Sequence, residues 1–401
     1  MTAEVEWPPG RPRILITDSW LANAGDAAIS LGLDATVRTI APTASILHAS
    51  YQYREIGPLL GDLRFVAPLE ELLGTPWAPP GPGWEERGAE LVAAADLVIC
   101  QAAGALVEAY GSVARIVALS DVVERGIPLA LVGLTASPWS RAAARRELRK
   151  VFGAAALVTV RDPHSLAVAA DLGAGQPVFG TDPALALFPE FRHQSTRSGI
   201  SVVLTNHHPD AERRRAAREA AGRVLREVVA AAAGEPVSVW STVQGFPALA
   251  GEDDAEVAAE LVSDLDLERG TIEVLTGYIT PRRAIDLVAG SRALVTMRLH
   301  PSLMAAATGT PFALILDGQR TGVFDGTGLE TRIVNPFDSD GPRVLIDRIL
   351  GEPSDPVGLW NALSPLRNRL EDTHARLRQV IEACADRSVM TGTRPSEAFT
   401  P

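Results

Sequence analysis

Cysteine is scarce in this sequence, and clusters of metal ligands are missing. Only two cysteines, Cys100 and Cys384, occur in 401 residues, and they lie far apart. Two such residues form neither a disulfide framework nor a zinc-binding spacing. Cys100 ends an apolar run, where a cysteine usually packs as a small buried hydrophobe. We therefore expect no disulfide-stapled fold, no metal site and no bound cofactor.

Long apolar runs and an excess of positive charge are also lacking. No stretch reaches the roughly 18 consecutive apolar residues that a membrane-spanning helix needs. Residues 1–9 lack the cationic and apolar regions of a secretory signal. The net charge of −12 excludes an overall basic footprint for nucleic acid. We expect a cytoplasmic protein with no nucleic-acid partner and no membrane span.

Three common functional motifs are absent as well. The chain has no P-loop, no glycine-rich dinucleotide fingerprint and no nucleophile elbow of a serine hydrolase. An acidic protein that binds an anion must therefore hold it with a local group of arginines, because its overall charge is repulsive. The arginines at the ends of predicted strands are the first candidates.

Apolar runs typical of strands alternate with helical patterns along the chain. They lie at residues 13–16, 95–100, 128–133, 156–160, 199–204, 236–240, 293–296 and 312–316. Continuous apolar strands separated by helices indicate an α/β fold of parallel sheets with both faces covered. A chain of this length favours two domains. The predicted units are an N-terminal domain (1–190), a C-terminal domain (199–364), a closing helix (365–386) and a disordered tail (387–401).

The most informative segment is residues 291–316. It predicts a buried strand, a short turn that carries Arg298 and His300, a helix with Pro301 at its first position and Gly309 at its end, and a second strand. Free N–H groups and the helix dipole make such a helix N-terminus an anion site. The alternative, equally open from the residues, is that Arg298 pairs with a carboxylate and His300 caps the helix.

Arg161 occupies a matching position in the first half, after the strand at 156–160. Asp162 and Pro163 follow it as a good N-cap and first helical residue. Two arginines facing each other across a cleft could hold one anion, since the planar guanidinium binds carboxylate or phosphate with two hydrogen bonds. A surface pair of Arg161 with Asp162 is the alternative. Arg320, after the strand at 312–316, is a third candidate cation.

Polar residues after other strands could complete a site. Asn23 and Asp26 follow the first strand, with Gly25 in the turn between them, and could hydrogen-bond sugar hydroxyls at the sheet edge. The alternative is that Asn23 shapes the turn and Asp26 caps the following helix. Asp182 would lie at the domain junction or simply in a turn. The small residues of the loop 101–105 could let a ligand approach the backbone, although close packing of a helix on a strand explains them better. His207 and His208 could line the cleft.

Taken in this order, the segments resemble the polysaccharide pyruvyltransferase family. The resemblance spans about residues 13 to 330 and rests on motifs at residues 23–26, 96–105, 161–165, 182–184 and 298–300. Its most specific part is the Arg-Leu-His unit at 298–300, followed by a helix of small residues and by Gly-Thr-Pro at 309–311. The small-residue loop, residues 134–138 and Arg320 differ from the usual family pattern.

The resemblance implies two Rossmann-like domains in a GT-B-like arrangement, with the site in the cleft between them. It implies phosphoenolpyruvate as co-substrate, a sugar or lipid-linked glycan acceptor, and transfer of a pyruvyl group as a ketal. Any membrane contact would be peripheral, through the acceptor, and a homo-oligomer stays open. The implied roles are donor binding for Arg161, Arg298, Leu299 and Arg320, acceptor binding for Asn23, Gly25 and Asp182, and catalysis for His300 and Asp26.

Two other functions fit the same residues. A nucleotide-sugar glycosyltransferase with this architecture would place Arg298 and Arg320 on a diphosphate. A non-catalytic relative that binds a glycan or a partner protein would explain the altered loops. The presence of Arg161, Arg298 and His300 argues against the non-catalytic relative, and the pyruvyltransferase function is favoured over both alternatives. His300 is the best acid–base candidate, since histidine side chains titrate near neutral pH.

Overall fold

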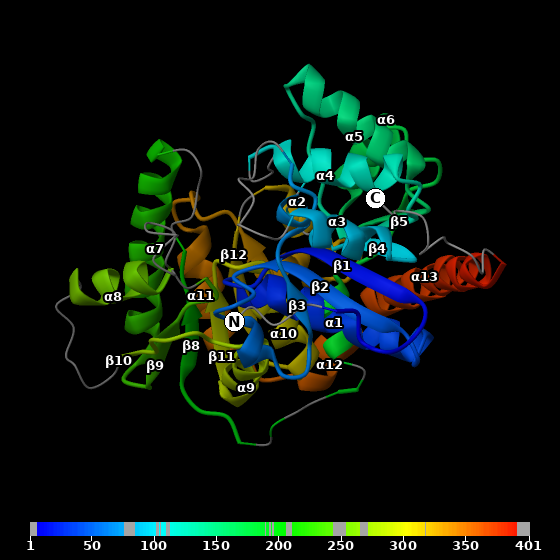
Figure 1. The fold of residues 1–401 in the computed structure, drawn as a ribbon. Coiled ribbons are helices and arrows are strands. Elements are labelled where there is room, and N and C mark those ends of the chain that lie inside the picture. The colour runs from blue at the N-terminus through cyan, green and yellow to red at the C-terminus, as the bar shows by residue number, and fades with distance from the viewer. Residues whose placement is uncertain are drawn as a thin grey trace.

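A computed structural model shows two parallel-sheet α/β domains (Figure 1). The structure describes residues 6–75, 85–101, 104, 106–109, 113–188, 190–191, 194, 196–205, 211–243, 254–264, 272–316 and 318–390. Within these residues every strand pairs in parallel with its neighbours, as the continuous apolar runs predict. The predicted fold class is confirmed.

The first sheet has seven strands in the order β3-β2-β1-β4-β5-β6-β7. Their bounds are β1 Arg13–Trp20, β2 Ser45–Tyr51, β3 Phe65–Val66, β4 Leu97–Cys100, β5 Leu129–Leu134, β6 Leu157–Val160 and β7 Val178–Phe179. The helices of this half are α1 Ala24–Ile40, η1 Gly57–Leu60, α2 Leu69–Leu72, α3 Glu85–Ala93, α4 Val113–Glu124, α5 Ala142–Ala154, α6 Pro163–Asp171 and η2 Pro183–Leu187. The strand order reverses between β1 and β4, where open α/β sheets usually bind ligands.

The second sheet has six strands in the order β10-β9-β8-β11-β12-β13. Their bounds are β8 Ile200–Val203, β9 Val237–Trp240, β10 Ile272–Val274, β11 Ala293–Thr296, β12 Phe312–Ile315 and β13 Ile333–Val334. Its helices are α7 Ala211–Ala232, α8 Asp254–Asp264, α9 Pro281–Gly290, α10 Leu299–Thr308, η4 Gln319–Phe324, η5 Leu329–Arg332, α11 Gly341–Gly351 and α12 Pro356–Ala362. The sheets divide between residues 179 and 200; the exact domain limits stay a prediction.

One apolar cluster joins the two halves. It combines Ile29 and Leu33 of α1 with Leu303 and Met304 of α10, so these two helices lie in a shared core. The last helix, α13 (Ser364–Met390), adds Leu377 to the same cluster and lies beside α1 in Figure 1. This helix ends four residues beyond the predicted limit of 386, and residues 391–401 lie outside the described part. The shared core holds the N-termini of α1 and α10 in one place.

The start of α10 differs from the prediction. The helix begins at Leu299 with Arg298 as its N-cap residue, so Pro301 occupies the third helical position instead of the first. Proline is tolerated there because the first four N–H groups of a helix have no partner inside the helix. Gly309 ends the helix with φ 68°, a left-handed conformation that favours glycine. The earlier start places the Arg298 backbone directly at the helix mouth.

Candidate active site

The N-termini of α1 and α10 meet at the junction of the two domains. A methyl group on Gly25 would lie 2.1 Å from Nδ1 of His300, so the imidazole rests directly on the glycine backbone. Beside this contact, the N–H of Ala24 donates to the Thr242 carbonyl at 2.8 Å, and Asn23 forms a β-bridge with Val243. Residues from both halves of the chain therefore build one site.

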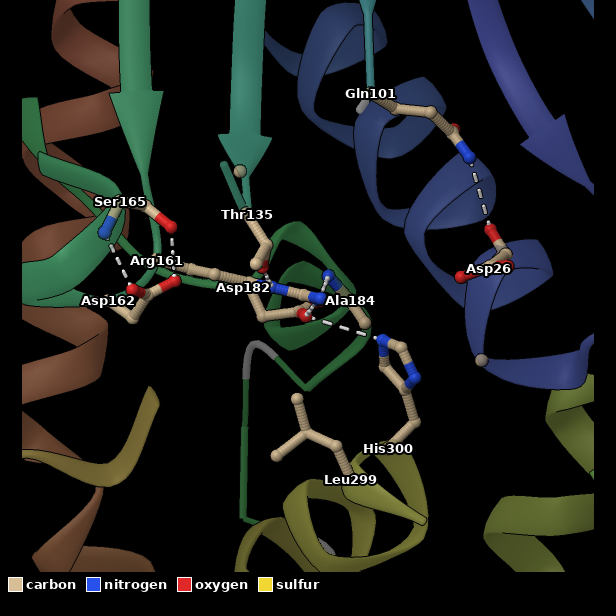
Figure 2. Close-up of polar contacts among 12 residues, drawn as sticks. Asp26, Gln101, Thr135, Arg161, Asp162, Ser165, Asp182, Ala184, Leu299 and His300 are labelled. Atoms are coloured by element: carbon tan, nitrogen blue, oxygen red, sulfur yellow. Dashed lines mark hydrogen bonds and ion pairs between the residues drawn. The ribbon is translucent and has the colours of Figure 1, made fainter. Parts of the chain in front are cut away.

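Arg161 is a buried cation with two polar side-chain contacts (Figure 2). Its Nε donates to Oγ1 of Thr135 at 2.7 Å, and its Nη1 donates to Oδ2 of Asp182 at 2.6 Å. Asp162 does not pair with it; that carboxylate caps α6 by accepting from the backbone and hydroxyl of Ser165. The surface pair of Arg161 with Asp162 is therefore excluded.

Asp182 joins Arg161 to His300. Nε2 of His300 lies 3.3 Å from Oδ2 of Asp182, an ion-pair distance that lacks the alignment of a hydrogen bond (Figure 2). Burial opposes the charge of Asp182, but His300 and Arg161 outweigh it and hold the pKa of Asp182 well below its usual range. Its other oxygen accepts from the N–H of Ala184 at 3.0 Å and caps η2. Asp182 is thus an ionised carboxylate that orients a cation and an imidazole.

The pKa of Asp26, in the first turn of α1, is shifted in the opposite direction to that of Asp182. Burial raises the pKa of Asp26, as does the charge of Asp182, while His300, Arg161 and Arg298 oppose the increase. Its backbone carbonyl accepts from Nε2 of Gln101 at 3.4 Å. Two carboxyl groups with pKa values shifted in opposite directions are a common arrangement for acid–base chemistry.

Arg298 is held by a carboxylate from α8. Its Nε and Nη2 both donate to Oδ2 of Asp254, at 2.9 and 2.6 Å. Its backbone N–H donates to Oγ1 of Thr296, the last residue of β11. Arg298 therefore pairs with a carboxylate, which was one of the two alternatives left open by the sequence. Its charge also opposes the increase in the pKa of Asp26. The charges of Arg298 and Arg161 therefore act on the same carboxyl group from different domains.

The remaining predicted residues have other surroundings. The side chain of Asn23 caps α1 by accepting from the N–H of Gly25 at 2.9 Å, so it, and not Asp26, is the helix cap. Leu299 is buried in the apolar cluster that joins the domains. The side chain of Arg320, together with His207 and His208, lies outside the described residues.

Three neighbours of the site were not predicted from the sequence. Thr135 and Asp254 contact the two arginines. Tyr278 donates its hydroxyl hydrogen to the Leu21 carbonyl at 2.8 Å; burial raises its pKa, and so does the charge of Asp26. The position of Asp254 at the start of a helix is visible in the sequence, but an acidic residue there is equally typical of a helix first turn with no role in a site.

Within the described residues, no group of three histidine, cysteine or acidic side chains could hold a metal ion. In the same part of the chain, no helix has the length and apolar character of a membrane span.

Comparison with known proteins gives a family and a fold. The family model for polysaccharide pyruvyl transferase matches residues 23–317. No curated protein matches the sequence significantly.

Among solved structures, the Anabaena Alr3699/HepE complex with UDP-glucose is 13% identical, with a TM-score of 0.59 over 93% of this chain and 99% of that one. The S. aureus MnaA–UDP structure is 12% identical, with a TM-score of 0.57 over 96% and 100%. The Neisseria meningitidis UDP-GlcNAc 2-epimerase is 12% identical, with a TM-score of 0.52 over 90% and 100%. At these identities the likeness shows the fold alone, which is of the GT-B type.

Proposed function

The chain belongs to the polysaccharide pyruvyl transferase family, and we propose that it transfers a pyruvyl group from phosphoenolpyruvate to a sugar of a cell-surface glycan or its precursor. The product is a ketal formed with two hydroxyls of one sugar, and inorganic phosphate is released. The observation that carries this proposal is the convergence of two arginines and two helix N-termini: Arg161 contacts the Asp182 that faces His300, and Arg298 begins α10, whose His300 rests on the start of α1.

This cluster suits a small and highly charged donor. Two guanidinium groups and two helix N-termini supply oriented positive charge for a carboxylate and a phosphate. Arg161, Asp182 and His300 are buried, which limits the access of water, so the same groups would also stabilise phosphate as it leaves. The sugar acceptor would then approach along the first sheet, next to the N-terminus of α1.

The reaction needs proton transfer in both directions. Carbon C3 of the donor gains a proton, and the first sugar hydroxyl attacks the resulting cationic C2 and loses its own proton. Phosphate then leaves with the electron pair of its C–O bond, and the second hydroxyl closes the ketal and loses its proton. We assign proton transfer to His300 and Asp26, because one imidazole and one carboxyl of raised pKa lie within the same charged cluster. Asp182 orients His300 and stays ionised.

Calorimetric titration with phosphoenolpyruvate at low salt tests the donor. The wild type should bind, and Arg298→Ala should bind about 10-fold or more weakly, because it loses a charge-assisted contact of about 1.5–3 kcal/mol. The control is Arg145→Ala, which removes an exposed arginine of α5 and should bind like the wild type. Binding of a nucleotide sugar without binding of phosphoenolpyruvate would overturn the proposal in favour of a glycosyltransferase.

Turnover tests the acid–base assignment separately. Phosphate release from phosphoenolpyruvate in the presence of an acceptor should fall by about 10²–10⁴-fold in His300→Ala, the usual contribution of a general acid or base. A variant with nearly normal turnover would remove His300 from the mechanism while leaving the donor assignment intact.

A further inference from the structure

Asp254 is a buried carboxylate that holds Arg298 from α8. Its side chain is 1% exposed, and one of its oxygens accepts both Nε and Nη2 of Arg298. A guanidinium group is planar and rigid, so holding Nε and Nη2 also fixes the direction of Nη1. Among the described residues, Nη1 of Arg298 has no hydrogen-bond partner. One edge of the cation is therefore held by Asp254, and no described residue bonds the other edge.

The position of Asp254 is in turn tied to the other domain. Its backbone N–H donates to the Val243 carbonyl at 3.2 Å, and Val243 forms the β-bridge with Asn23 at the cap of α1. The neighbouring Thr242 carbonyl accepts from Ala24. The contacts that place Asp254 thus begin at the helix end that carries Asp26, so Arg298 is positioned relative to both halves of the site.

The other arginine is held in a similar way. Arg161 uses Nε for Thr135 and Nη1 for Asp182. Both arginines therefore direct Nε and one Nη toward the protein, although they belong to different domains and have different partners. This arrangement lowers the positive charge available to a ligand, since each arginine has a carboxylate partner. Its benefit must then be orientation, which preorganised sites need before the ligand arrives.

We propose that Asp254 is a positioning residue that fixes Arg298 for the anionic donor; this inference rests on the proposed function for the identity of that donor. Its effect comes from hydrogen-bond acceptance by the side chain and not from its negative charge. Asparagine keeps an oxygen that can accept from Nε and Nη2 and removes the charge. Alanine removes both the oxygen and the charge, so Arg298 loses its fixed orientation.

The test compares these two substitutions by calorimetric titration with phosphoenolpyruvate. Asp254→Asn should bind within about threefold of the wild type or more tightly, because a negative charge near the anion is gone. Asp254→Ala should bind about 10-fold more weakly, since a charge-assisted hydrogen bond on Arg298 loses its alignment. The matched controls are Glu256→Gln and Glu256→Ala, which change an exposed acid in the first turn of the same helix and should bind like the wild type.

Folding is checked by thermal melting of each variant. If Asp254→Ala does not fold, Asp254→Ser replaces it, since serine still suits a helix start but is too short to hold Arg298. Tighter binding by both Asp254→Asn and Asp254→Ala would show that the carboxylate competes with the ligand, which overturns the proposal. Equal weakening in both variants, or no weakening in Asp254→Ala, would also overturn it.

A second series with inorganic pyrophosphate separates this inference from the proposed function. If the wild type binds pyrophosphate but not phosphoenolpyruvate, and only Asp254→Ala loses affinity, the donor assignment fails and the positioning role stands. If phosphoenolpyruvate binds and Asp254→Ala binds as well as the wild type, the positioning role fails and the donor assignment stands. If the wild type binds neither anion, both are overturned.

Discussion

Gly25→Ala is the substitution that most directly tests the contact between the domains. The added methyl group would lie 2.1, 2.6 and 2.9 Å from Nδ1, Cγ and Cε1 of His300. Ordinary contact begins near 3.4 Å, so the imidazole or the start of α1 must move by about 1 Å. The ring is also placed by its contact with Asp182, which a movement of this size would break or stretch.

Two opposing effects decide what happens to stability. Alanine favours a helix over glycine by up to about 1 kcal/mol, whereas overpacking a close contact costs about 1–3 kcal/mol. The net loss is then at most about 3 kcal/mol, which a folded domain of ordinary stability tolerates. Catalysis is more sensitive, because a displacement of about 1 Å can cost about 100-fold in rate. Gly25→Ala should therefore fold and lose most turnover.

The assay measures phosphate release from phosphoenolpyruvate with an acceptor present, alongside the melting temperature. Gly222→Ala is the matched control, since it makes the same change within α7 and its methyl group would meet its nearest neighbour at an ordinary 3.4 Å. The reasoning is refuted if Gly25→Ala turns over at the wild-type rate, because His300 would then not depend on this contact.

Two further predictions concern buried carboxyl groups. Burial, with help from the charge of Asp18, raises the pKa of Glu70 to about 7 against opposition from Arg115. The folded state therefore retains this proton longer than the unfolded chain, and stability falls as pH rises from about 4.5 through 7, by up to about 3 kcal/mol in all. Urea unfolding at pH 5 and pH 8 should show that the wild type loses stability between these pH values and that Glu70→Gln does not. An equal loss in both proteins would contradict the assignment to Glu70. Asp182→Ala should lower the unfolding free energy at pH 7 by about 3 kcal/mol or more, because it leaves Arg161 buried without its carboxylate; a smaller loss would mean that another group neutralises Arg161.

Local features of the site were predictable from sequence because their signals lie within one turn of a helix. Asp162 and Pro163 occupy the N-cap and first helical positions of α6, as their residue types indicate. The strand before Arg298 and the glycine that ends α10 also follow from local preferences. In each case the residue's own backbone conformation or its nearest N–H groups decide the structure.

The partners of the two arginines were not predictable in the same way. Asp162 is the acidic residue next to Arg161 in the sequence, yet Asp182 accepts its hydrogen bond because β6 and β7 are neighbouring strands that end at the same edge. Thr135 contacts Arg161 because β5 pairs with β6, with Leu134 opposite Val160. Gly25 was expected in a turn on the acceptor side, and nothing in the sequence indicated that His300 from the other domain would pack against it. Such contacts depend on the order of the strands and the placement of the domains, which the hydrophobic periodicity of the sequence does not predict.

The positive charges of the cluster are largely balanced by carboxylates before any ligand binds. Arg161 faces Asp182, and Arg298 faces Asp254, so the two arginines are already matched by two carboxylates. A donor that carries a carboxylate and a phosphate adds negative charge to a site with little net positive charge left, and that addition favours proton uptake by the nearest titratable groups. Asp26 is such a group, because burial already raises its pKa and a bound anion would raise it further. In the proposed reaction, donor binding would then protonate Asp26, one of the two groups assigned to proton transfer, before the acceptor arrives.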